Sequence, residues 1–206
     1  MALLELDRVV AGYVEGIDIL NGLTLNVARG SVTGIIGPNG AGKSTSLKTV
    51  FGFLHPRAGR IVFDGHDIAS LAPHALKRLG IGYVPQAANV FPQLTVEENL
   101  QLGAWVFRHD RPKVATMLDR AYAAFPRLGE KRRLRATVLS GGEAKMLSVA
   151  KELVTAPSLL LVDEPSAGLA PRIADQVYER LREVQTAGVT ILLVDQNVTK
   201  AVEISD

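Results

Sequence analysis

Hydrophobic and polar positions alternate in short runs along the first third of the chain, a pattern typical of half-buried β-strands. The runs cover residues 3–10, 23–27, 32–36 and 60–63, with turn signals at Asn21-Gly22 and Asp64-Gly65. A helix is expected over residues 44–53, directly behind a glycine-rich loop. A short strand is expected over residues 81–84, closed by Pro85.

From residue 95 to about residue 125 the apolar positions follow helical spacing instead. Thr95 can cap a helix whose first turn carries Glu97 and Glu98, where acidic side chains favour the helix dipole. A second helix is expected over residues 112–125, because proline is accepted in a first helical turn. This stretch therefore indicates an inserted helical subdomain.

The last third alternates helices with continuous apolar runs. Helices are expected over residues 142–154 and 171–185, strands over 159–162 and 189–194, and a short helix at the end. Strands that are apolar throughout are typical of a parallel sheet covered on both faces. The pattern predicts an α/β fold.

Composition narrows the class of protein further. With 206 residues, 47% hydrophobic and 21% charged, the chain is expected to fold as a soluble globular domain. It has no cysteine, which excludes a disulfide scaffold or a cysteine metal cluster and suits the cytosol. The longest uncharged run, residues 79–96, is broken by Pro85 and Pro92, and the N-terminus lacks a signal-peptide layout. We expect a cytoplasmic protein unless a partner brings it to a membrane.

The net charge of +2 is unevenly distributed. Residues 106–136 carry nine basic side chains against three acidic ones, so this segment could face nucleic acid, anionic lipid or an acidic partner. The favoured alternative is a solvated helical face, because no aromatic residues are interleaved for base stacking in the densest basic run, residues 127–135. The histidines lie outside the motifs described next and are expected at surface or turn positions: His55, His66, His74 and His109.

Residues 37–44 read GPNGAGKS and match the phosphate-loop pattern in full, with an apolar strand before and a helix after. Glycines let the backbone N–H groups turn toward phosphates, and the helix N-terminus adds its positive dipole. A glycine turn without a ligand is disfavoured by this context. The residues expected to hold a nucleotide are Asn39, Gly40, Ala41, Gly42, Lys43, Ser44 and Thr45, with Lys43 on the β- and γ-phosphates and Ser44 on Mg²⁺.

An apolar strand ends in Asp163-Glu164. A carboxylate at the carboxyl end of a parallel strand lies beside a phosphate loop, so we expect Asp163 to hold Mg²⁺ through water. Glu164 is the candidate general base for an attacking water. Alone this motif is weak; beside the phosphate loop it indicates nucleotide hydrolysis.

The segment LSGGE at residues 139–143 is a second anion-binding device, because Ser140 and two glycines stand at a helix start. One nucleotide needs only one phosphate loop, so the second device suggests contact with a nucleotide held by another chain. A simple turn is the alternative, but it does not explain the position one helix before the acidic strand.

The order of phosphate loop, Gln86, LSGGE and LLLVDEP resembles the nucleotide-binding domain of ABC transporters over essentially all 206 residues. This resemblance implies two domains paired head to tail around two ATP molecules. Ser140, Gly141 and Gly142 would then bind the partner's ATP, with Ser140 and Gly142 on the γ-phosphate. It also implies that Gln86 senses Mg²⁺ and the water, and that Tyr13 stacks on adenine; alone, Tyr13 would be read as a surface or strand residue.

The resemblance implies a P-loop NTPase fold of the ABC ATPase type: a mostly parallel sheet core, an antiparallel β subdomain and a helical subdomain. Residues 1–206 would form one ABC ATPase domain, with 1–94 and 156–206 as catalytic core including the N-terminal β subdomain and 95–155 as helical subdomain including the signature helix. Such domains usually continue past residue 206 with strands and a helix, so the C-terminus is expected to be shortened.

A narrower resemblance rests on GPNGAGKST, VFPQLTVEENL, LSGGE, DEPSAGLAP and LLVDQN, which together are similar to the ATPase subunits of branched-chain amino acid importers; urea and amide importers have similar subunits. It implies ATP and Mg²⁺ as cofactors, a second ABC ATPase subunit, transmembrane permease subunits at the inner face of the cell membrane and, indirectly, a solute-binding protein. No nucleic acid is expected. Residues 87–94 and the helical subdomain would dock the permease, with Phe91 and Leu94 as exposed anchors or as core residues.

Three positions depart from the family pattern. Gln196 stands where the family has a switch histidine, although some amino acid importer subunits also carry glutamine there. Because glutamine retains an N–H donor, we expect Gln196 to sustain a slow or partner-dependent ATPase rather than an inactive one. Glu143 replaces the usual glutamine of the signature, and Ala170 replaces an aspartate that communicates across the dimer.

Two alternatives stay open at this point. Gln196 could mark a degenerate, regulatory site in a heterodimer, although the presence of Glu164 argues against it. The basic segment could indicate a DNA-repair or translation ABC ATPase, although those usually carry coiled coils or tandem cassettes for which this chain has no room.

Overall fold

A computed structural model describes residues 2–206. Eight strands form two four-stranded sheets, ordered β2-β1-β4-β5 and β3-β8-β7-β6. The strands are β1 Ala2–Ala11, β2 Leu20–Ala28, β3 Val32–Ile36, β4 Ala58–Phe63, β5 His66–Asp67, β6 Ile81–Val84, β7 Leu159–Asp163 and β8 Thr190–Asp195. The helices are α1 Lys43–Val50, α2 Pro73–Leu79, α3 Val96–Gly103, η1 Trp105–Phe107, α4 Arg111–Ala124, α5 Pro126–Glu130, η2 Ala136–Val138, α6 Gly141–Leu153, α7 Pro171–Thr186 and α8 Val198–Ile204.

The sheet β3-β8-β7-β6 is parallel throughout. Alternate residues of β7 enter different cores: Leu159 and Leu161 pack toward α1, and Leu160 and Val162 pack toward α6, α7 and α8. All four are fully buried, so neither face of β7 meets solvent. This two-sided burial is why the strand reads as an uninterrupted apolar run.

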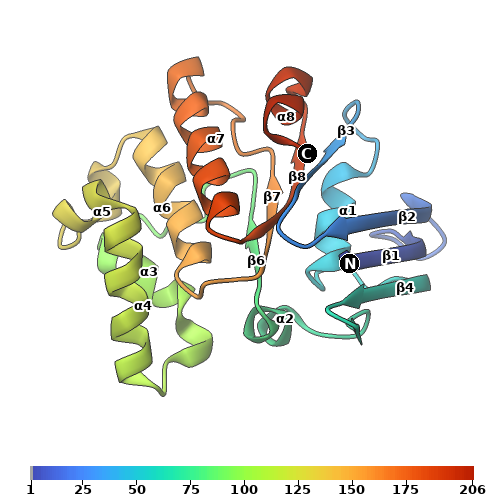
Figure 1. Cartoon of the computed structure of the whole chain (residues 1–206), viewed down its shortest axis with the longest axis horizontal. Coiled ribbons are helices and arrows are strands. Elements are labelled where there is room, and N and C mark those ends of the chain that lie inside the picture. Colours follow the sequence, from blue (N-terminus) through green and yellow to red (C-terminus); the bar gives the residue numbers. More distant parts are fainter. Residues whose placement is uncertain (1) are drawn as a thin grey trace.

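The antiparallel sheet packs on the α1 side and shares a core with it (Figure 1). The expected turn at Asn21-Gly22 is wrong, because both residues lie inside β2. Gly22 has a φ of 80°, and the pairing of β1 with β2 shifts register between Val9 and Val10. The glycine therefore accommodates an irregularity within a long strand, a role that shares its sequence signal with a turn.

The helices α3, α4, α5 and α6 gather at the opposite end of the molecule from the antiparallel sheet (Figure 1). Two of these helices start with a capping box, in which the N-cap hydroxyl and the glutamate three residues later bond each other's backbone N–H. Thr95 with Glu98 caps α3, and Ser140 with Glu143 caps α6. Both helix starts were expected from the sequence.

Several short elements carried no periodic signal and were not expected: α2, β5, α5 and η2. The helical stretch from residue 95 to 125 is divided into α3, η1 and α4. Within residues 2–206, none of the helices has the length and hydrophobicity to cross a membrane.

Candidate functional site

The phosphate loop joins β3 to α1, with Gly40 and Gly42 at φ values of 81° and 86°. A side chain at Gly42 would be strained there and would also lie 3.1 Å from Leu20 and 3.2 Å from Ile19. No side chain of the described residues caps the N-terminus of α1, so its first N–H groups keep their hydrogen-bonding capacity. A curled loop leading into an uncapped helix N-terminus is suited to binding an anion.

Lys43 places a cation at the centre of this loop. Its Nζ donates to the carbonyl oxygens of Gly37 at 2.9 Å and Pro38 at 3.0 Å, and the residue is buried. The aliphatic stem is thereby enclosed and the ammonium is held against the loop. The other expected loop residues divide between exposed and buried: Asn39, Gly40 and Ala41 are exposed and Thr45 is buried.

Asp163, at the end of β7, lies against the start of α1 although 119 residues separate it from Ser44. The Ser44 hydroxyl donates to Asp163 Oδ1 at 2.7 Å, and the Tyr83 hydroxyl donates to Oδ2 at 3.2 Å. Burial, with the neighbouring Asp163 second, raises the pKa of Tyr83 well above its ordinary value, so the phenol stays a donor. The Asp163 carboxylate is thus buried and oriented toward the phosphate loop.

Glu164 lies between two amides. Gln86 Nε2 donates to its Oε2 and Gln196 Nε2 donates to its Oε1, both at 2.6 Å. The Glu164 backbone has a φ of 42°, which costs energy for a residue with a side chain, and its N–H is held by Val194 O at 2.8 Å. Both carboxylate oxygens are therefore oriented, and Gln196 supplies one of the two donors.

One face of α6 holds the segment that carries Gln86. Lys145 Nζ donates to the carbonyl oxygens of Pro85 and Gln86, both at 2.9 Å. Further along the helix, Ser148 donates to the Asn89 side chain at 2.8 Å, and Lys151 donates to the Asn89 carbonyl. Burial lowers the pKa of Lys145 to about 8, with Asp163 and Asp195 opposing the shift.

At the other end of α6, the Ser140 hydroxyl is engaged with Glu143, 3.1 Å from its Oε2. Lys131 donates to Glu143 Oε1 at 2.6 Å, and this bond together with Ser140 lowers the pKa of Glu143. The glutamate that departs from the usual signature therefore carries its own counter-ion. The two glycines differ: a Cβ on Gly142 would lie 2.6 Å from Ile173, whereas a Cβ on Gly141 would meet nothing within 4 Å.

Tyr13 is 53% exposed and stands beside α1. Lys48 Nζ donates to the Tyr13 hydroxyl at 3.2 Å and lies 5.4 Å from the ring centroid. Lys48 belongs to α1, the helix whose first turn bounds the phosphate loop, so it holds the Tyr13 ring beside that helix. An exposed, oriented ring at this place can stack on a planar group.

A sequence profile described as "ABC transporter" matches residues 20–167. The chain belongs to the ABC transporter family. It is an ATP-binding subunit of that family. The helical end of the molecule, the parallel sheet and the antiparallel sheet correspond to the expected ABC ATPase fold.

Curated relatives of the ABC family cover nearly the whole chain. A probable branched-chain amino acid transport ATP-binding protein, LivF of Archaeoglobus fulgidus, is 43% identical over 95% of this chain and 82% of its own length. A high-affinity branched-chain amino acid transport ATP-binding protein, BraG of Pseudomonas aeruginosa, is 39% identical over 99% of this chain and 86% of its own. Among solved structures, the ADP conformation of MJ1267, an ATP-binding cassette of an ABC transporter, has a TM-score of 0.88 at 30% identity, covering 100% of this chain and 85% of that one.

The expected residues fall into three groups in this ABC subunit. Lys43, Ser44 and Asp163 meet at the phosphate loop, and Gln86, Glu164 and Gln196 meet beside it. The signature residues lie at the N-terminus of α6, and among residues 2–206 no hydrogen bond joins them to either group. Tyr83 and Lys145 were not expected at this site, because a tyrosine in an apolar strand and a lysine in a helix carry no signal of what they contact.

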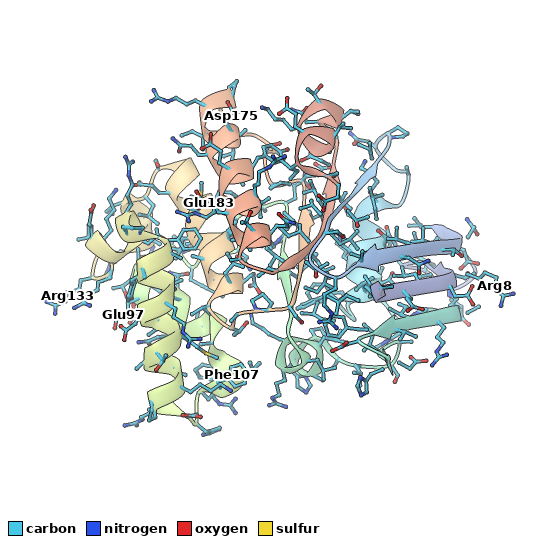
Figure 2. The ribbon with its side chains drawn as sticks, in the orientation of Figure 1. Arg8, Glu97, Phe107, Arg133, Asp175 and Glu183 are labelled. Carbon is cyan, nitrogen blue, oxygen red and sulfur yellow. The ribbon has the colours of Figure 1, made fainter. Side chains whose placement is uncertain are left out.

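The remaining candidates lie outside these groups. The four histidines are all exposed. The arginines of the basic segment are exposed, and Figure 2 shows Arg133 projecting outward from the helical end. Trp105, directly before this segment, lies under Arg108, whose Cζ is 5.2 Å from the ring centroid.

Proposed function

We propose that this subunit hydrolyses ATP with Glu164 as the general base. The observation that carries the proposal is the pair of 2.6 Å bonds from Gln86 and Gln196, which orient a buried carboxylate next to Asp163. An oriented carboxylate can accept the proton of a water that attacks the γ-phosphate in line. Positioning and charge neutralisation supply most of the rate enhancement in such reactions.

The phosphate loop supports ATP as the substrate. The N–H groups at the start of α1 and the Lys43 ammonium would hold the phosphates, and the oriented Tyr13 ring would stack on adenine. The oxygen donors Ser44, Asp163 and Gln86 fit Mg²⁺, which binds hard oxygen ligands together with substrate phosphates and would neutralise charge on the transferred group.

The arrangement of the signature residues supports a second subunit as partner. Gly142 has a reason to be glycine within the chain, its contact with Ile173, but Gly141 has none. An exposed helix N-terminus with a glycine that faces open space suits close approach by the phosphates of a partner's ATP. We propose that Ser140, Gly141 and Gly142 bind that ATP and that residues 95–155 act as the helical subdomain.

The transported solute is proposed from the relatives. The two relatives described above are named for branched-chain amino acid transport, so we propose that the subunit powers import of these amino acids or a similar small solute. It would be attached to permease subunits at the inner face of the membrane, and a solute-binding protein would deliver the solute to them. The permease would contact residues 87–94, where Phe91 is 52% exposed, and the helical subdomain, which has a groove of about 440 Å³ lined by Gln101, Trp105 and Leu118. A purely regulatory subunit is not favoured, because Glu164 is present and oriented.

The test is MgATP turnover by the purified chain as a function of its concentration, with Glu164→Gln as the central variant. We expect turnover to rise more steeply than linearly with concentration, because two copies are needed. The Glu164→Gln variant should lose this turnover and still bind ATP. Glu130→Gln, an exposed carboxylate in α5, is the matched control and should behave like the parent. Unchanged turnover in Glu164→Gln would remove Glu164 from its role.

A further inference from the structure

Three segments around the proposed base meet at one buried phenol. Tyr178 of α7 is 3% exposed, and its hydroxyl lies 2.9 Å from Ser166 Oγ and within hydrogen-bonding distance of Asp195 Oδ2. Ser166 follows Glu164 by two positions, and Asp195 directly precedes Gln196. Tyr178 thus lies between the two loops whose side chains, Glu164 and Gln196, bond each other.

A phenol has one proton and two lone pairs, so it can serve both neighbours only in one arrangement. The carboxylate of Asp195 has no proton to donate, so Tyr178 donates to Asp195 and accepts from the hydroxyl of Ser166. Burial, followed by the bond to Asp195, raises the pKa of Tyr178 far above its ordinary value, so the phenol remains protonated. The phenol therefore keeps the proton that it donates to Asp195 at neutral pH.

Asp195 also shapes the backbone around Gln196. Its Oδ1 accepts the N–H of Asn197 at 2.9 Å, which closes a side-chain turn with Gln196 at its centre. Asp195 is 2% exposed, and within residues 2–206 no lysine, arginine or histidine forms an ion pair with it. Losing the Tyr178 donor would leave a buried carboxylate oxygen short of a partner, which is costly.

We propose that Tyr178 is a positioning residue for ATP hydrolysis. Its hydroxyl holds Asp195, Asp195 holds the turn around Gln196, and Gln196 then keeps its amide on Glu164. The bond to Ser166 anchors the same phenol to the loop that follows Glu164. This inference rests on the proposed function, since it assigns Tyr178 a part in orienting the proposed base.

The test compares two Tyr→Phe variants, each of which removes one oxygen and keeps the ring. Tyr178→Phe removes the bridge, whereas Tyr122→Phe removes a hydroxyl that has no hydrogen-bond partner among the described residues. We expect kcat of Tyr178→Phe to fall about tenfold, the size of one lost hydrogen bond to a charged group, with KM for MgATP nearly unchanged. Tyr122→Phe should match the parent.

A double variant separates positioning from general loss of stability. In a Gln196→Ala background the amide is already absent, so adding Tyr178→Phe should lower kcat little further. A full tenfold loss in that background, an equal loss in Tyr122→Phe, or no loss in Tyr178→Phe would each overturn the proposal.

Hydrogen exchange gives a readout that does not depend on turnover. The Asn197 amide should exchange at least about tenfold faster in Tyr178→Phe than in the parent, because Asp195 is no longer held. Unchanged exchange overturns the inference about Tyr178. A different result separates the two proposals. If the Asn197 amide loses protection in Tyr178→Phe but turnover survives in Glu164→Gln, the bridge is retained and the proposed base is rejected.

Discussion

The two glycines of the signature, Gly141 and Gly142, allow a test that distinguishes a role in helix packing from a role in binding a partner's ATP. They are adjacent in the first turn of α6, yet only Gly142 faces another element of the chain, the side chain of Ile173 on α7. Gly142→Ala and Gly141→Ala therefore make the same chemical change in the same helical turn. Their consequences should differ.

The size of the difference follows from the contacts. A Cβ at position 142 would lie 2.6 Å from Ile173 Cγ2, well inside the ordinary carbon–carbon separation of about 3.5–4.0 Å. Overpacking of this kind costs about 1–3 kcal/mol, and the helix preference of alanine returns up to about 1 kcal/mol. We expect Gly142→Ala to lower the free energy of unfolding by about 1–2 kcal/mol and Gly141→Ala to leave it unchanged or slightly raised.

Urea unfolding followed by circular dichroism measures both variants under identical conditions. For a chain of this size, each kcal/mol corresponds to a Tm change of about 2–4 °C, which thermal unfolding resolves. Equal stabilities of the two variants would refute the assignment of Gly142 to helix packing. Turnover then completes the test: Gly141→Ala should lose ATPase activity without losing stability, because its methyl group would face the partner's ATP.

Two further predictions concern stability. Burial lowers the pKa of Lys145 to about 8, so the unfolded chain binds more protons than the folded one between about pH 8 and 10.5, and the stability of the parent relative to Lys145→Met should rise by roughly 3 kcal/mol across that window; parallel pH curves in urea unfolding would contradict this. Ala170 occupies the N-cap of α7 without a side-chain hydrogen bond, so Ala170→Asp should supply one and raise the free energy of unfolding by about 1 kcal/mol in the same assay, whereas Ala187→Asp, at the other end of that helix, should not.

Features that depend on neighbouring residues in the chain could be predicted from the sequence. The phosphate loop is set by its own glycines and by the strand and helix that flank it. The capping residues Thr95 and Ser140 act on N–H groups three positions away, so their signal is local. The apolar run of β7 records burial on both faces of a sheet, which needs no knowledge of which helices cover it.

The wrong or missing predictions concern segments whose local signal is ambiguous or too short. The Asn21-Gly22 pair gives the same signal in a turn and in an irregular strand, and only pairing with β1 decides between them. The short helices α2 and α5 are too brief to show a helical period, so tertiary packing determines them.

The arrangement of the candidate site was decided by the tertiary structure. Gln86 and Gln196 reach Glu164 across 78 and 32 residues, and Tyr178 reaches Asp195 across 17. A hydrogen bond depends on distance and direction in space, and the sequence specifies neither for residues on different elements. The sequence by itself therefore determined which chemical groups the chain carries and on which strand, helix or loop each one lies. The packing of α6 and α7 against the parallel sheet decided which of those groups touch.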